Sequence, residues 1–401
     1  MGCIVGTLPI DSVEDDRAWL AAVFAAGVEA VHPRVALAQR VISMPEPQRL
    51  GRRRLIAIGK AAGAFARAFV ERFPVDDGIV IAPADAPASV DGLIDAPGNH
   101  PLPSEQSLAA GLRLWDFIGE ANGDDVYVVL LTGGASALCV LPIEGVTLEQ
   151  KRQATLELMR RGASIAELNQ LRRRLSLIKG GGLERRLSPA RCVTLAISDV
   201  QGDDPEVIGS GPTISSAASL PNYAVIASLD DALQAAREYA VAAGVEVMDL
   251  GRTLYGSVDS EAARIVAEIH RCRSVQRLDD RPTLMLAGGE PVITVQGNGL
   301  GGRAQHLALA IGAALEGMEG VTVLAAGTDG IDGPTVAAGA FADEATNRRL
   351  RARGLAAANV LARCDSHSAL TAIGDLWVTG RTDTNVADLL LVLIRPARIP
   401  A

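Results

Sequence analysis

Aromatic residues are scarce in this chain of 401 residues: Phe, Trp and Tyr together make up 3% of it. This scarcity counts against a surface that stacks the bases of single-stranded nucleic acid. The net charge of −9 counts against a general binder of phosphate backbones. We therefore expect no nucleic-acid partner.

Lysine is even scarcer, because only three of the 38 basic residues are lysine: Lys60, Lys151 and Lys179. Lysine supplies a compact point charge where arginine supplies a planar fork, so a lysine beside glycines suggests an anion site. Lys60 follows a glycine and Lys179 precedes three of them, which makes both candidates. Lys151 lies in an expected helix, and we attribute its presence there to chance.

The sequence also lacks a C-x-x-C spacing and an obvious export or membrane signal. Five scattered cysteines suit a reducing compartment and indicate neither a zinc knuckle nor a redox pair. No apolar run reaches about 18 residues, and the N-terminus does not read as a secretory signal. We expect a cytoplasmic protein without a membrane partner, and homodimerisation is the default expectation for an enzyme of this size.

Buried strands alternate with helices along the first part of the chain, as is typical of a doubly wound, mostly parallel α/β sheet. The polar stretch 273–282 reads as a linker, and a new alternation after it predicts a smaller C-terminal α/β domain. We therefore expect two domains, residues 1–275 and 283–401. The expected strands include residues 55–59, 78–82, 126–131, 192–197, 245–249, 283–287, 292–296, 321–326 and 389–394. The expected helices include residues 13–43, 60–73, 223–242, 258–274 and 303–317.

A glycine-rich loop precedes the last of these expected helices and reads Gly297-Asn298-Gly299-Leu300-Gly301-Gly302-Arg303. Its G-x-G-x-x-G spacing matches the dinucleotide-binding fingerprint. The arginine directly after the last glycine instead favours the phosphate loop of a transferase, in which Gly299, Gly301 and Gly302 offer bare N–H groups. A purely structural turn is the third interpretation.

Aspartates cluster at the ends of two expected strands. Asp329 and Asp332 flank a glycine, and such a carboxylate pair suits Mg²⁺ or a substrate hydroxyl. The alternative is an Asx turn without chemistry, because Asp-Gly is common in turns. Asp199 follows the strand 192–197 and is a candidate general base or magnesium ligand.

The turn Thr132-Gly133-Gly134-Ala135-Ser136 ends another expected strand. It lacks the G-x-S-x-G pattern of a nucleophile elbow. We therefore interpret Ser136 as a hydroxyl at an anion-binding helix start, with a plain N-cap as the alternative. Among the histidines only His100, in a loop rigidified by prolines, is a candidate for function.

Taken in order, these motifs resemble the type II glycerate kinases, which are glycerate 2-kinases with a C-terminal MOFRL domain; some members carry the name hydroxypyruvate reductase. The resemblance covers about residues 15–395. The matching segments are Ile58-Gly59-Lys60-Ala61-Ala62, Gly98-Asn99-His100-Pro101-Leu102-Pro103, Thr132-Gly133-Gly134-Ala135-Ser136, Glu167-Leu168-Asn169, Lys179-Gly180-Gly181, Ser198-Asp199-Val200, Ser210-Gly211-Pro212-Thr213, Gly288-Gly289-Glu290, Gly301-Gly302-Arg303 and Thr328-Asp329-Gly330-Ile331-Asp332.

The resemblance implies transfer of the γ-phosphoryl group of ATP to the 2-hydroxyl of D-glycerate, with Mg²⁺, in a cleft between two α/β domains. By motif, Lys60 matches the essential lysine of the family and Arg303 its essential arginine. On this basis we expect the turn 133–136, the loop 297–302 and Lys179 to hold the phosphates of ATP. The other expected site residues are Asp199 as the proton acceptor, Asp329 and Asp332 as metal ligands, and Asn169, His100 and Glu290 for the substrate.

The chain departs from the family pattern at several positions, notably Ala304, His306 and Val336, where the family usually has Asn, Glu and Asp. Two lost carboxylates leave the metal and the acceptor open, so a kinase of a related short sugar acid is one alternative. An NAD(P)H-dependent hydroxypyruvate reductase that uses the glycine loop is another. A binding protein without turnover is the third.

Overall fold

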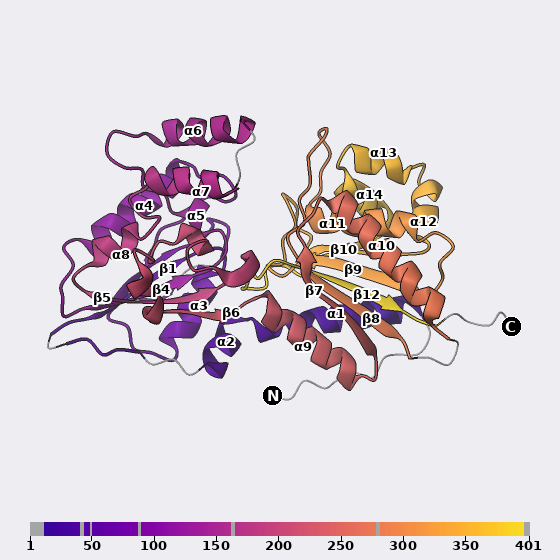
Figure 1. Cartoon of the computed structure of the whole chain (residues 1–401), viewed down its shortest axis with the longest axis horizontal. Coiled ribbons are helices and arrows are strands. Elements are labelled where there is room, and N and C mark those ends of the chain that lie inside the picture. The colour runs from indigo at the N-terminus through magenta and orange to yellow at the C-terminus, as the bar shows by residue number, and fades with distance from the viewer. Residues whose placement is uncertain are drawn as a thin grey trace. The chain divides into compact units, whose positions relative to one another are not determined.

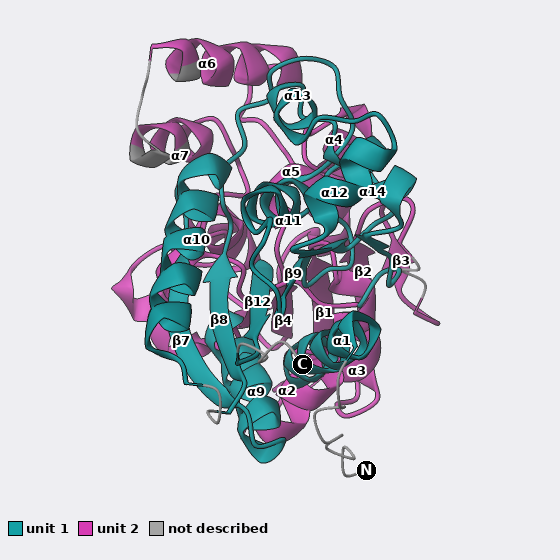
Figure 2. Cartoon of the chain, turned by 90° about the vertical axis from the view of Figure 1, so that its right-hand side faces the viewer, with its two compact units in different colours: residues 1–30, 229–382, 387–401 teal, residues 31–228, 383–386 magenta. Residues whose placement is uncertain are grey.

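The computed structural model describes residues 12–40, 44–48, 50–86, 90–161, 165–277 and 281–396. The chain forms two compact units, coloured separately in Figure 2. Unit 1 contains the chain up to Ala30, residues Leu229–Thr382 and the chain from Ala387 onward. Unit 2 contains Val31–Ser228 and the short segment Asp383–Val386.

Unit 2 is built on a six-stranded sheet in the order β3-β2-β1-β4-β5-β6, in which every neighbouring pair is parallel. This order confirms the predicted doubly wound parallel sheet. Helices α4, α5 and α8 contribute to a core on one face, whereas α3 packs against β1, β2 and β4 outside that core (Figure 1). The strands are β1 (Arg53–Ile58), β2 (Asp77–Ile81), β3 (Ile94–Asp95), β4 (Val126–Leu131), β5 (Arg191–Ile197) and β6 (Tyr223–Ala227). The helices are α2 (Pro33–Gln39), α3 (Ala62–Val70), α4 (Glu105–Ile118), α5 (Ala135–Leu138), α6 (Leu148–Arg160), α7 (Ile165–Arg174) and α8 (Gly182–Leu187).

Unit 1 is built on a mixed sheet in the order β11-β10-β9-β12-β8-β7. Its central strand β12 is antiparallel to both neighbours, while β7 is parallel to β8. Helices α1 and α9 pack together and contact the sheet, and α10 and α11 share a second core with alternate residues of the strands. The strands are β7 (Glu246–Leu254), β8 (Thr283–Gly289), β9 (Val321–Gly327), β10 (Gly339–Asp343), β11 (Leu376–Trp377) and β12 (Asp388–Ile394). The helices are α1 (Val13–Ala30), α9 (Leu229–Ala242), α10 (Val258–Val275), α11 (Arg303–Ala314), α12 (Thr346–Ala352), α13 (Ala357–Ala362) and α14 (Ser366–Ile373).

Three expected elements were wrong. The helix expected over 13–43 is two helices, because Pro33 occupies the first turn of α2 and His32 caps it. The helix expected over 223–242 begins with strand β6, whose β-branched and aromatic residues pair with β5. Residues 293–296 form no strand, and the segment is linked to Ser257 by a single bridge at Val292.

The compact units divide the chain at positions other than the predicted domain boundary, because β7, α9 and α10 belong to unit 1. The division into residues 1–275 and 283–401 stays a prediction. None of the described helices is long and apolar enough by itself to cross a membrane, although α1 and α2 taken as a bent pair meet that test.

Candidate functional site

The order in which the chain adds strands to the sheet of unit 2 reverses between β1 and β4, because β2 and β3 follow on one side of β1 and β5 and β6 follow on the far side of β4. In doubly wound sheets, ligands bind beyond the carboxyl ends of the strands at this switch point. Gly59 and Lys60 follow β1, the turn 132–136 follows β4, and Asp199 follows the neighbouring strand β5. Because these strands are parallel, the three segments predicted from the sequence lie together at the carboxyl ends of the strands.

The backbones after β1 and β4 approach closely. The N–H of Lys60 donates to the carbonyl of Gly133 at 2.8 Å, and the Ala61 N–H donates to the Thr132 hydroxyl at 3.1 Å. Gly59 has a φ of +142°, and a Cβ atom there would lie 2.0 Å from the Thr132 hydroxyl oxygen. A side chain at position 59 would therefore push the two segments apart.

Asp199 lies against the second glycine segment. A Cβ atom on Gly133 would lie 1.9 Å from the Asp199 Oδ2 atom and 2.2 Å from the Asn385 Nδ2 atom. That nitrogen donates a hydrogen bond to the same carboxylate oxygen at 2.8 Å. The amide of Asn385 thus fixes the orientation of the Asp199 carboxylate beside the turn.

The turn itself offers backbone donors. Within the described part of the chain, the N–H groups of Gly133, Gly134, Ala135 and Ser136 have no recorded hydrogen-bond acceptor. Gly134 adopts a φ of +83°, and successive N–H groups in such a turn form an anion-binding concavity. A Cβ atom on Gly134 would lie 3.0 Å from the His100 ring and 3.1 Å from Lys60 Cγ, so both side chains flank the turn.

The predicted Ser136 and Lys179 are connected through Ser210. The hydroxyls of Ser136 and Ser210 lie 2.8 Å apart, and the carbonyl of Ser210 accepts the Gly180 N–H at 3.0 Å. Lys179 is 5% exposed, and its burial lowers the pKa of its ammonium well below the ordinary value. Asn169 belongs to α7, and its side chain lies outside what the structure describes.

In unit 1 the predicted Arg303 is held by two carboxylates. Its guanidinium donates to Asp388 at 2.6 and 3.1 Å and to Glu290 at 2.7 Å. These carboxylates raise the pKa of Arg303, so the guanidinium stays charged, whereas burial raises the pKa of Asp388 to about 6. Arg303 is thus oriented at the start of α11 by partners that the glycine motif did not reveal.

The glycines before Arg303 pack against protein atoms. A Cβ atom would lie 2.4 Å from the Arg363 carbonyl at Gly299, 2.2 Å from the Ser366 hydroxyl at Gly301 and 2.2 Å from the Asp332 carboxyl carbon at Gly302. These close approaches explain why the three positions are glycine, since a side chain at any of them would collide with neighbouring protein atoms. Their role in phosphate binding stays a prediction to which the local geometry adds no support.

Asp332 caps helix α11 from a distant loop. Its carboxylate accepts the N–H groups of Ala304 at 3.1 Å and Gln305 at 2.8 Å, and also the Gln305 side-chain amide at 2.9 Å. Because the start of a helix favours a negative charge, this carboxylate fills the place that a phosphate would take. Burial raises the pKa of Asp332 despite these donors.

Asp329 lies half-buried at the end of β9, and its Oδ1 atom accepts the Ile331 N–H at 3.0 Å. This is the Asx-turn geometry that was the alternative to metal binding. No group of three or more His, Cys, Asp or Glu side chains that could hold a metal ion is found within the described ranges. The metal roles of Asp329 and Asp332 stay predictions.

Of the departures from the family pattern, two are buried and one is exposed. Ala304 and His306 lie in α11 at 1% and 4% exposure, and burial lowers the pKa of His306. Val336 is 68% exposed. His306 is therefore a core residue in which burial disfavours the charged imidazolium form.

Sequence reasoning missed Asn385 and Asp388. Asn385 lies three residues before the apolar strand β12, and Asp388 is the first residue of that strand. Polar side chains at a strand boundary were a usable signal, but their partners, Asp199 and Arg303, are 186 and 85 residues away in the sequence. Pairing at that separation follows from the fold and cannot be read from local patterns.

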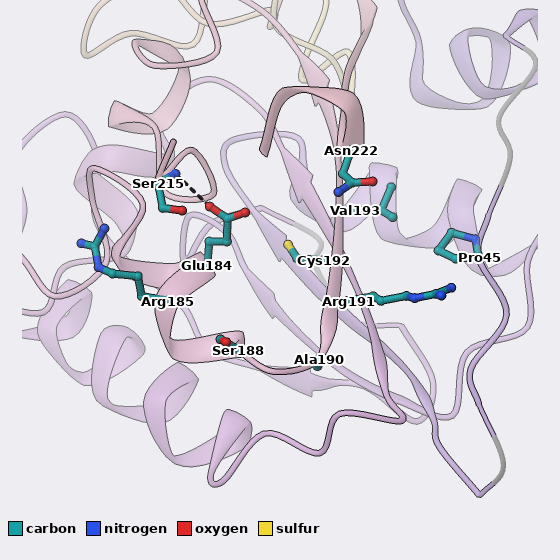
Figure 3. A pocket seen from close by; sticks show the side chains of 10 residues that line it. All are labelled: Pro45, Glu184, Arg185, Ser188, Ala190, Arg191, Cys192, Val193, Ser215 and Asn222. Carbon is teal, nitrogen blue, oxygen red and sulfur yellow. Dashed lines mark hydrogen bonds between the residues drawn. The ribbon is translucent and has the colours of Figure 1, made fainter. Parts of the chain in front are cut away.

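A hollow of about 480 Å³ in unit 2 lies away from this chemistry (Figure 3). Its lining includes Arg191 and Cys192 at the beginning of β5, and thus the amino end of the sheet. The Glu184 carboxylate in it accepts the Ser215 N–H at 2.8 Å, and burial raises the pKa of the Cys192 thiol to about 12. We therefore place the candidate site at the opposite, carboxyl ends of the strands.

Two family descriptions match the chain. Residues 19–246 match a domain of unknown function, DUF4147, and residues 283–388 match the MOFRL family. A D-glycerate 2-kinase of Thermotoga maritima is 35% identical, and the alignment covers 92% of this chain and 95% of that protein. A protein of Agrobacterium vitis, provisionally named a hydroxypyruvate reductase, is also 35% identical over 94% of each chain.

A solved structure has the same fold. The crystal structure of a glycerate kinase from Thermotoga maritima superposes with a TM-score of 0.81 at 33% identity and covers 95% of this chain and all of that one. A Pyrococcus horikoshii protein of solved structure superposes with a TM-score of 0.73 at 27% identity, covering 95% of this chain and 99% of that one.

Proposed function

The chain belongs to the type II glycerate kinases, the family that joins a DUF4147 domain to a MOFRL domain, and we propose that it is a D-glycerate 2-kinase. In this reaction the γ-phosphoryl group of ATP moves to the 2-hydroxyl of D-glycerate. The products are ADP and 2-phospho-D-glycerate.

The observation that carries this proposal is the 35% identity to a D-glycerate 2-kinase over 92% of the chain. The geometry of unit 2 is consistent with it. At the switch point of the sheet lie the backbone N–H groups of the turn 133–136, the side chain of Lys60 and the Asp199 carboxylate, which is oriented by Asn385. Phosphoryl transfer depends mainly on positioning and on stabilising charge, which such a set of groups can supply.

In this proposal the turn 133–136 binds phosphate oxygens through its N–H groups, and Lys60 neutralises charge that develops on the transferred group. Asp199 accepts the proton of the attacking hydroxyl. The hydrogen bond from Asn385 holds that carboxylate in place, so Asn385 is a positioning residue. Arg303 contributes a second positive charge, in keeping with its match to the essential arginine of the family.

We further propose that Mg²⁺ accompanies ATP. This ion keeps several water ligands and is usually held by substrate phosphates and one or two carboxylates, so it needs no cage of protein ligands. Asp329 fits such a role better than Asp332, whose carboxylate already accepts three hydrogen bonds. The ion would neutralise phosphate charge. The cytoplasmic location and the homodimer expected from the sequence stay predictions.

The reductase alternative is not favoured. A dinucleotide-binding loop requires glycines that admit a pyrophosphate after a strand, whereas Gly299 and Gly301 pack against protein atoms and no strand precedes them at 293–296. The test is to incubate the protein with ATP, Mg²⁺ and D-glycerate and measure ADP release, and separately with NADH and hydroxypyruvate. ADP release that depends on D-glycerate supports the kinase, and NADH oxidation without it contradicts the proposal.

A further inference from the structure

All three lysines of the chain lie in unit 2, and two of them are buried and near enough to each other for the charge of Lys151 to lower the pKa of Lys179. Lys151 lies on α6 and Lys179 between α7 and α8, with exposures of 6% and 5%. Helices α6 and α7 pack side by side (Figure 1), and Arg172 of α7 is near enough to lower the pKa of both ammonium groups. Lys151, whose presence we attributed to chance from the sequence alone, thus belongs to a buried cluster of basic side chains.

No carboxylate balances this cluster among the residues that the structure describes. Neither lysine forms an ion pair there, and the Lys151 ammonium has no hydrogen-bond partner. The neighbouring group is the Cys139 thiol, and burial raises its pKa to about 12, so it brings no negative charge. A buried charge without a partner is costly, and in this arginine-rich chain an apolar side chain could fill the same space without that cost.

We propose that Lys151 and Lys179 form a binding site for a small oxyanion, with Arg172 as a third cation. The proposal rests on the proposed function, under which the anion is the carboxylate of D-glycerate or a phosphate of the nucleotide or product. The site adjoins the reaction centre, because Gly180 is bonded to Ser210, and the Ser210 hydroxyl contacts Ser136 of the turn. The bound anion supplies the negative charge that balances the basic side chains of this cluster.

Proton uptake should accompany binding. Burial lowers the pKa of Lys151 to about 8, and burial together with the charge of Lys151 lowers that of Lys179 well below its ordinary value. An anion favours the protonated form of each lysine and raises both pKa values. The affinity should therefore fall as the pH rises through about 8, where Lys151 loses its proton.

The experiment is titration calorimetry of the full chain with D-glycerate and with inorganic phosphate, in two buffers of different ionisation enthalpy. For Lys151→Met we expect affinity for the anion to fall at least about tenfold, proton uptake to shrink, and the Tm to rise because an unpaired buried charge has been removed. Arg160→Met, which removes an exposed charge from the same helix, should leave all three unchanged. Lys151→Arg, which keeps the charge, should bind within a few fold of the parent if it folds.

The outcomes separate the possible anions. If Lys151→Met weakens the binding of D-glycerate but not of phosphate, the occupant is the carboxylate of D-glycerate. If it weakens the binding of phosphate but not of D-glycerate, the occupant is a phosphate. Unchanged affinity for both anions in Lys151→Met overturns the site, as does a lower Tm with unchanged affinity, which would indicate a structural lysine. If the parent protein does not phosphorylate D-glycerate but its phosphate affinity still depends on Lys151, the proposed function fails and the anion site stands.

Discussion

At the scale of single residues, Lys60 bears the largest part of the proposed chemistry. Its side chain flanks Gly134 in the turn with unfilled N–H groups. For Lys60→Ala we expect kcat/KM to fall at least about 100-fold, or roughly 2.7 kcal/mol of transition-state stabilisation. The Tm should hardly change, since Lys60 is half-buried at the sheet edge. Near-parental turnover in this variant would remove Lys60 from the mechanism.

Gly133 permits the contact between the turn and the Asp199–Asn385 pair. An alanine there would place its methyl group 1.9 Å from the Asp199 carboxylate, which must then move. Because misplacement of a reacting group by about 1 Å can cost on the order of 100-fold, we expect Gly133→Ala to lose at least tenfold in kcat. Gly123→Ala is the control, since its nearest new contact is an ordinary 3.4 Å. Equal steady-state rates in the two variants would contradict the assigned role of Asp199.

At the scale of elements, helix α11 depends on Asp332 for its cap. Asp332→Asn replaces an acceptor oxygen by a donor beside two backbone N–H groups, so we expect a loss of about 1–2 kcal/mol in the free energy of unfolding, measured without added metal. Asp329→Asn should leave this stability almost unchanged and instead alter the Mg²⁺ dependence of turnover. If Asp332→Asn is as stable as the parent protein but needs more Mg²⁺, Asp332 is a metal ligand and the capping role is secondary.

Elements were predictable where the pattern is local. The buried apolar run 126–131 was located from the sequence and lies where expected, as strand β4. Strand β6 was not, because its pairing with β5 outweighs a local pattern that resembles a helix. Site prediction had the same limit: the segments at the carboxyl ends of β1, β4 and β5 were identified, whereas Asn385, Asp388 and Lys151 gained their meaning only from distant partners.

At the scale of the whole molecule, unit 1 is assembled from segments far apart in the sequence. Its sheet packs against α1 and α9, and α10 shares a core with α11. A fragment of residues 283–401 lacks α1, α9, α10 and β7, so we expect it to expose apolar surface and to show no cooperative unfolding transition in urea. A cooperative transition with native-like circular dichroism would instead support an independent C-terminal domain with the boundary expected from the sequence.

The central claim is that the chain phosphorylates D-glycerate at its 2-hydroxyl. The most direct measurement is ³¹P NMR of the product formed from ATP, Mg²⁺ and D-glycerate, compared with authentic 2-phosphoglycerate and 3-phosphoglycerate. The account predicts that the 2-phosphoglycerate resonance grows with that of ADP and stays absent without D-glycerate. Formation of 3-phosphoglycerate, or no phosphorylated acid under conditions in which ATP binds, would contradict it.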